Sequence, residues 1–219
     1  MPGLITRWAA DLVSLNPDAD PDDVAAVGAE LLARWTESHR RYHSTRHLVE
    51  MFWALEDLTD AGELTEDEAR LARVAAWLHD AQYDPAASPG ANEAASARLA
   101  TTVLPRAGLA ATDTAVVVEL VEMTAAHEVP HGSSLQRAFH DADLWILAAP
   151  RERFDGYCGQ VREEYAAVPD EVYRLGRTAI LRGLVGPDGI YLSAYGTEHW
   201  EDPARENVAR ELARLAQLD

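Results

Sequence analysis

Two segments of the sequence combine histidine with residues that bind metal ions. His43 and His47 are four residues apart, so both lie on one helix face if the helix has begun by then. His79 and Asp80 end an apolar helical stretch, where both side chains can reach one ion. Imidazole and carboxylate together suit a divalent transition metal. Taken alone, each pair is more typical of a core histidine or of a histidine favoured by the helix dipole than of a metal site.

A third segment, 139–147, places two acidic residues in an apolar helix. Asp141 and Asp143 are costly to bury there unless a partner or a metal neutralises them. A helical projection puts Asp143 on the more apolar flank and Asp141 one turn after a possible partner, Arg137. We therefore favour Asp143 as a ligand and keep Asp141 as the alternative. His127 closes the preceding helical stretch, where it is either functional or favoured by the helix dipole.

Helices must position all of these residues, because apolar residues recur every three or four positions through most of the chain. Asp20-Pro21 is typical of a helix start, and Thr65 with Glu68 predicts a helix that runs to about His79. Further helices are expected over about residues 4–15, 44–58, 92–103, 113–126, 134–148, 151–166, 171–184 and 203–218. Longer loops are expected at 81–91 and 185–202. No segment alternates like a half-buried strand, so we predict an all-α fold.

Charge and composition narrow the possible partners. The chain has 219 residues and a formal net charge of −18, with 37 acids against 19 basic residues that are all arginine. Such a field repels phosphate backbones and anionic lipids, which argues against extended nucleic acid or a membrane as partners. A single cysteine, Cys158, and the lack of a signal-peptide pattern predict a cytoplasmic protein. Length and short loops predict one domain over 1–219, with helices of 1–34 packed onto it.

The order His47, His79-Asp80 and Asp143, on separate predicted helices, resembles the ligand pattern of the HD superfamily of metal-dependent phosphohydrolases. From about residue 35 onwards, the chain also resembles the bacterial predicted metal-dependent HD phosphohydrolases. The motifs that carry this resemblance are Arg-x-Tyr-His-x-x-x-His at 40–47, His-Asp with Tyr-Asp-Pro at 79–85, Asn-Glu-x-x-Ser-Ala at 92–97, Thr-x-x-His at 124–127, Asp-Ala-Asp-Leu at 141–144 and Val-Arg-Glu-Glu-Tyr at 161–165. The chain departs from the family pattern at His140 and at Ala81-Gln82, which leaves the shape of the substrate pocket open.

The resemblance implies a compact helical bundle of the HD-domain type with one divalent metal ion. The implied metal ligands are His47, His79, Asp80 and Asp143. These residue types do not distinguish Mn, Fe, Co, Ni, Zn and Mg. A divalent ion in such a site lowers the pKa of a bound water and polarises a phosphoryl oxygen. The implied activity is therefore hydrolysis of a phosphate ester of a small metabolite or nucleotide.

The neighbouring motifs supply further candidates for the site. The expected catalytic residues are Asp80, His43 and His127. A dication balanced by two carboxylates leaves the substrate phosphate in need of more positive charge. The residues expected to bind substrate are Arg46, Arg162 and Tyr165. Two other functions fit the same pattern: a catalytically idle module that binds nucleotide or phosphate, and a di-iron oxygenase in which His43 and His127 add ligands.

Overall fold

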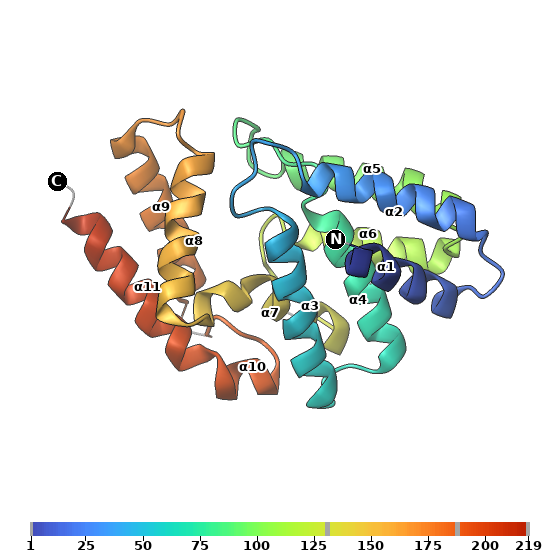
Figure 1. The fold of residues 1–219 in the computed structure, drawn as a ribbon. Coiled ribbons are helices and arrows are strands. Elements are labelled where there is room, and N and C mark those ends of the chain that lie inside the picture. Colours follow the sequence, from blue (N-terminus) through green and yellow to red (C-terminus); the bar gives the residue numbers. More distant parts are fainter. Residues whose placement is uncertain (1, 130–131, 187–188, 218–219) are drawn as a thin grey trace.

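The computed structural model describes residues 2–129, 132–186 and 189–217. Within these ranges the chain forms helices and no named strand, which confirms the predicted all-α class (Figure 1). The elements are α1 (Pro2–Leu15), α2 (Pro21–Trp35), α3 (Thr45–Asp60), α4 (Glu66–His79), α5 (Ala91–Arg106), α6 (Ala111–Met123), α7 (Ser134–Leu144), the 3-10 helix η1 (Trp145–Ala148), α8 (Arg151–Glu164), α9 (Asp170–Leu184), α10 (Ala194–His199) and α11 (Glu201–Ala216). None of the helices described is long and apolar enough to cross a membrane.

Local capping interactions explain where several helices begin. The side chain of Asp20 accepts hydrogen bonds from the backbone of the first turn of α2. Thr65 and Glu68 form the expected reciprocal capping box at the start of α4. Ser133 and Gln136 form a second capping box that starts α7. These short-range contacts fix the helix starts independently of the tertiary packing.

The helices after α5 depart from the sequence prediction in several places. The helix expected over 113–126 ends at Met123, and the turn that follows carries His127 in a left-handed conformation with φ of 53°. The helix expected over 134–148 tightens into the 3-10 helix η1 after Leu144. The loop expected over 185–202 contains α10, which has only 6 residues and is too short for helical periodicity to reveal.

Helix α4 is the centre of the packing. It contacts α1, α3, α5, α6 and α7, and every residue from Ala72 to His79 is buried. Figure 1 shows α1, α2, α5 and α6 on one side of the molecule and α8 to α11 on the other, with α3 and α7 between them. The end of the most buried helix, which carries His79, therefore lies where these two groups of helices meet.

A buried ion pair connects the N-terminal helix to this centre. Asp11 of α1 and Arg73 of α4 are 4% and 5% exposed, respectively. The guanidinium donates from Nε and Nη2 to the two carboxylate oxygens, at 2.9 and 2.6 Å. Because both charges lie inside the packed core, each depends on the other for neutralisation.

We predict that Asp11→Ala lowers the free energy of unfolding by about 3–5 kcal/mol, because it leaves the Arg73 charge buried without its partner. Urea unfolding followed by circular dichroism measures this loss. The control is Asp67→Ala, which removes an equally short but exposed pair with Arg70 (2.7 Å). Water screens that pair, so the control should lose far less stability. Equal losses in the two variants would contradict the prediction.

Candidate metal centre

Four predicted ligands converge at the inner end of α4. His47 lies in the first turn of α3, His79 ends α4, Asp80 follows it as the C-cap and Asp143 is near the end of α7. The Nε2 atoms of His47 and His79 are 3.2 Å apart. Oδ2 of Asp80 lies 3.0 Å from Nε2 of His79 and 3.8 Å from that of His47. One ligand atom from each of these three residues lies within 4.8 Å of the others, so this cluster could hold a metal ion.

Asp143 completes the cluster from the side of α7. Its Oδ1 lies 3.1 Å from Nε2 of His47 and 3.4 Å from Nε2 of His79. Two imidazoles and two carboxylates therefore face a common centre, supplied by the start of α3, the end of α4 and the end of α7. Transition-metal ions accept this combination of nitrogen and oxygen ligands.

The second ring nitrogens of both histidines are engaged away from the cluster. Nδ1 of His79 lies 3.0 Å from the carbonyl oxygen of Ala76, which can only accept, so Nδ1 donates. In the neutral ring, Nε2 then carries a lone pair that faces two carboxylates. Nδ1 of His47 is hydrogen-bonded to the Tyr42 hydroxyl at 3.1 Å. Such outer hydrogen bonds orient metal-binding imidazoles, so the residues present fit a metal ion.

The electrostatics of the cluster favour a positive charge at its centre. Burial by itself would lower the pKa of His79, but the carboxylates of Asp80 and Asp143 outweigh burial and raise it well above its ordinary value. Burial would raise the pKa of Asp143, but His79 and His47 outweigh it and hold that pKa well below its usual range. The cluster thus stabilises two ionised carboxylates inside the protein, provided that a cation lies between them.

Asp141 has a different place in the fold. Its carboxylate is fully buried and accepts hydrogen bonds from the backbone of Leu192 and from the backbone and hydroxyl of Ser193, at 2.6–2.8 Å. The expected pairing with Arg137 is wrong, because that side chain donates to a backbone carbonyl instead. Of the two aspartates Asp141 is the more buried, since the Asp143 side chain is 12% exposed. The structure nevertheless brings Asp143, and not Asp141, to the two imidazoles.

Glu164, at the end of α8, holds His43 beside the cluster. Its side chain is fully buried, and its Oε2 accepts from Nδ1 of His43 at 2.6 Å and from the Tyr83 hydroxyl at 2.9 Å. Burial would raise the pKa of Glu164, but the hydrogen bonds from His43 and the nearby backbone lower it to about 2. Nε2 of His43 is left 4.0 Å from Oδ2 of Asp80. The imidazole therefore faces the metal ligands while a carboxylate fixes its orientation.

Glu164 was not among the predicted site residues, although the apolar residues at helical spacing before it indicate a buried position. Glu164 follows Tyr157 and Val161 at helical spacing, and all three are buried. An acidic residue on an apolar helix face requires a buried partner or several hydrogen-bond donors. The adjacent Glu163, which is exposed, made the pair resemble an ordinary charged helix end.

His127 reaches the cluster from the turn after α6. Its Nε2 lies 3.7 Å from Oδ2 of Asp143, and its buried Nδ1 has no hydrogen-bond partner among the described residues. Burial lowers the pKa of His127 more than the nearby Asp143 raises it. The ring lies 5.3 Å from that of His140, whose Nε2 is bonded to the carbonyl of Ile190. His127 therefore offers a neutral imidazole at the edge of the cluster.

The two arginines expected to bind substrate lie elsewhere. Arg46 is one residue away from His47, so its side chain leaves α3 in another direction, where it pairs with Glu50 at 2.9 Å. Arg162 pairs with Asp170 at 2.7 Å on the outer side of α8. Neither lines the pocket that contains the metal cluster. Tyr165 lines a neighbouring pocket together with His43.

Arg177 of α9 lines the pocket of the metal cluster, where Arg46 and Arg162 were expected. The pocket around the cluster has a volume of about 230 Å³, and Arg177 is the arginine among its described lining residues. His43, His127 and Asp143 line the same pocket. Arg177 follows Tyr173 and precedes Leu181 at helical spacing, so an arginine within an apolar stripe was the missed signal.

We predict that Asp143→Asn sharply lowers the metal content, because it removes one carboxylate from the cluster. Asp141→Asn should retain metal but lose about 1–3 kcal/mol of stability, since it weakens the hydrogen bonds to Leu192 and Ser193. Mass spectrometry of bound metal and urea unfolding measure the two effects. Loss of metal in Asp141→Asn with full occupancy in Asp143→Asn would exchange the roles of the two residues.

The chain was compared with protein-family models, curated protein sequences and solved structures. The chain matches no protein-family model, no curated protein sequence and no solved structure. The convergence of His47, His79, Asp80 and Asp143 is therefore the main observation on which a function can be built.

Proposed function

We propose that the protein is a metal-dependent phosphohydrolase with a helical bundle of the HD-domain type. One observation carries the proposal: two imidazoles and two carboxylates converge beside His43, which a buried glutamate orients toward the same pocket. Metal ligands alone would suit storage or a structural ion. An oriented imidazole in an accessible pocket beside them supports hydrolysis, because the leaving group of an ester needs a proton.

The protein's own groups divide the work in this proposal. When bound, a divalent metal supplies a Lewis acid for a phosphoryl oxygen and activates water. His79 and His47 are held by Ala76 and Tyr42 so that their Nε2 atoms remain available as ligands. The Nδ1–H group of His43 donates a hydrogen bond to Glu164, and a proton on Nε2 would be transferred to the leaving oxygen of the ester.

The test of this proposal is a screen of the metal-reconstituted protein against phosphomonoesters and nucleotides. Protein stripped with a chelator is loaded with manganese, iron, cobalt, nickel, zinc or magnesium in turn. We expect release of inorganic phosphate that requires a divalent metal and disappears in His79→Ala. Metal binding without turnover of any ester would instead support the idle binding module.

A variant of the orienting residue tests the part played by His43. We predict that Glu164→Gln lowers kcat by about 10²-fold or more, because a neutral amide no longer holds the His43 ring through the short hydrogen bond that the carboxylate accepts from Nδ1. Metal content should be unchanged. His199→Gln alters an exposed histidine of α10 and should leave both quantities as in the wild type. An unchanged kcat in Glu164→Gln would remove His43 from the mechanism.

A di-iron oxygenase is the second candidate, and one geometric feature favours it. Two further histidines flank the cluster: His43 lies 4.0 Å from Asp80, and His127 lies 3.7 Å from Asp143. These imidazoles could serve a second metal ion. Elemental analysis distinguishes the candidates, since two irons per chain with oxygen consumption would support the oxygenase.

A further inference from the structure

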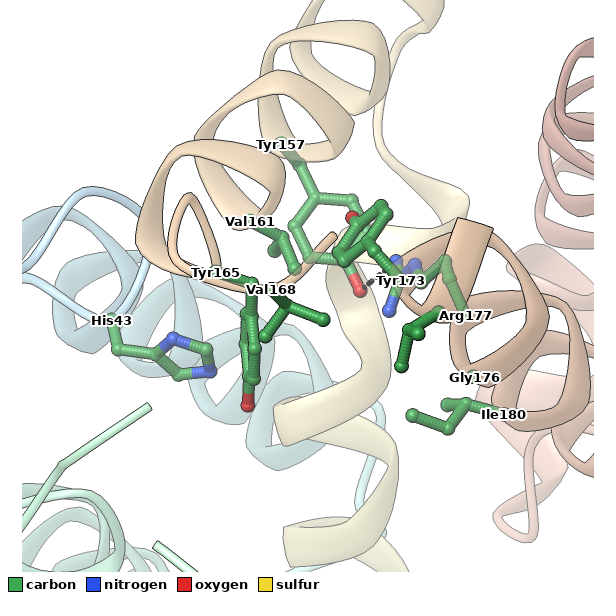
Figure 2. Close-up of a pocket in the computed structure, with 10 residues that line it drawn as sticks. His43, Tyr157, Val161, Tyr165, Val168, Tyr173, Gly176, Arg177 and Ile180 are labelled. Atoms are coloured by element: carbon green, nitrogen blue, oxygen red, sulfur yellow. Dashed lines mark hydrogen bonds between the residues drawn. The ribbon is translucent and has the colours of Figure 1, made fainter. Parts of the chain in front are cut away.

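An apolar pocket lies beside the metal pocket. It has a volume of about 360 Å³, within the usual range of small-ligand sites. Figure 2 shows that His43 forms one end, while the other lining residues come from α8, α9 and the turn between them. His43, Tyr157, Arg177 and Ile180 line both pockets, so the two spaces lie side by side.

The walls of this pocket are aromatic and aliphatic. Tyr165 and Tyr173 contribute rings, and Val161 contributes an aliphatic side chain. At the rim, Val172 and Ile180 are 58% and 57% exposed. Large apolar side chains with this exposure around a concave site are typical of surfaces that bind an apolar group. Flat rings match aromatic walls well, because they stack at little entropic cost.

Arg177 lies where this apolar pocket meets the metal pocket. It is 8% exposed, and its Nη2 donates to the Tyr157 hydroxyl. Within the described part of the chain it forms no ion pair, and its buried Nε has no hydrogen-bond partner. A guanidinium is always charged in proteins, and a buried charge is costly without an anion. The side chain thus presents unused donors beside the metal cluster.

We propose that Arg177 and the apolar pocket form the substrate-recognition subsite, and that the substrate is a phosphate ester of a flat, mainly apolar alcohol. The phosphate would lie between the metal cluster and Arg177, and its organic group would extend into the pocket between Tyr165 and Tyr173. The inference rests on the proposed phosphohydrolase function. It adds the class of the organic group and replaces Arg46 and Arg162 with Arg177 as the phosphate-binding arginine.

Two phosphonates test the subsite without requiring turnover, because their carbon–phosphorus bond is not an ester. Phenylphosphonate carries a flat ring, and methylphosphonate carries the same anion without it. Calorimetry on the manganese-loaded and the metal-free protein measures both affinities. We expect phenylphosphonate to bind about tenfold more tightly or better, since the ring leaves water for the pocket.

Two variants separate the anion site from the apolar pocket. Arg177→Gln should weaken both phosphonates by roughly 30-fold or more, because a charge-assisted contact is lost. Gly176 lies on α9 with open space around its Cβ position, and it lines the pocket. Gly176→Phe should therefore fill the pocket and remove the preference for phenylphosphonate, with little effect on methylphosphonate.

The matched controls are Arg182→Gln, an exposed arginine of the same helix, and Gly176→Ala, which adds only a methyl group. Both should bind the two phosphonates as the wild type does. Equal affinity for the two ligands in the wild type, or unchanged binding in Arg177→Gln, would overturn the inference. Gly176→Phe keeps the test decisive if Arg177→Gln fails to fold.

Failure of the subsite and failure of the proposed function give different results. Turnover of small polar esters without a preference for the aromatic phosphonate would leave the phosphohydrolase intact and overturn the subsite. Preferred binding of phenylphosphonate that depends on Arg177, in a protein that hydrolyses no ester, would retain the subsite and overturn the phosphohydrolase.

Discussion

The carboxylate of Glu164 is the contact on which the geometry of the site depends. It accepts five hydrogen bonds: three from the backbone N–H groups of residues 41–43, one from His43 Nδ1 and one from the Tyr83 hydroxyl. A single buried charge thus joins the end of α8 to the segment before α3 and to the turn after α4. Arg40 supports the same junction, since it donates to the carbonyl oxygens of His43, Asp80 and Ala81. The carboxylate of Glu164 and the guanidinium of Arg40 thus both hold the segment before α3, which leads to the ligand His47.

The metal cluster imposes a second constraint, because it places two carboxylates and two imidazoles close together inside the protein. Inside a protein, unpaired charges are far more costly than in water. The chain meets this constraint by placing the ligands at or near helix ends. His79 illustrates this: it ends α4, in which every residue from Ala72 onwards is buried. The site is therefore rigid on the α4 side and open on the side of α9, of whose 15 residues only Arg177 and Leu181 are buried.

The metal pocket and the apolar pocket beside it therefore have walls of different chemistry. The inner wall consists of metal ligands and histidines, which suit an anion bound to a cation. The outer wall consists of tyrosines and aliphatic residues around Arg177, which suit an apolar group. The proposed chemistry and the proposed specificity thus come from different helices. Substitutions on α9 such as Gly176→Phe should alter binding without disturbing the metal, whereas those at Asp80 or Asp143 should alter both.

The sequence alone determined the all-α class and most helix positions, because periodicity and capping are local properties. It also marked the candidate ligands by their residue types, but it joined them into one set only through the resemblance to the HD phosphohydrolases. It could not place Arg46, Arg162 or Arg177, since an arginine's direction depends on which helices pack beside its own. The sequence did not predict α10, because six residues are too few to show helical periodicity. It did not predict the buried hydrogen-bond partners of Asp141 either, because Leu192 and Ser193 are about fifty residues further along the chain. Glu164 shows the limit most clearly. Its helical spacing marked it as buried, but only the packing of α8 against the segment before α3 decided that it would orient His43.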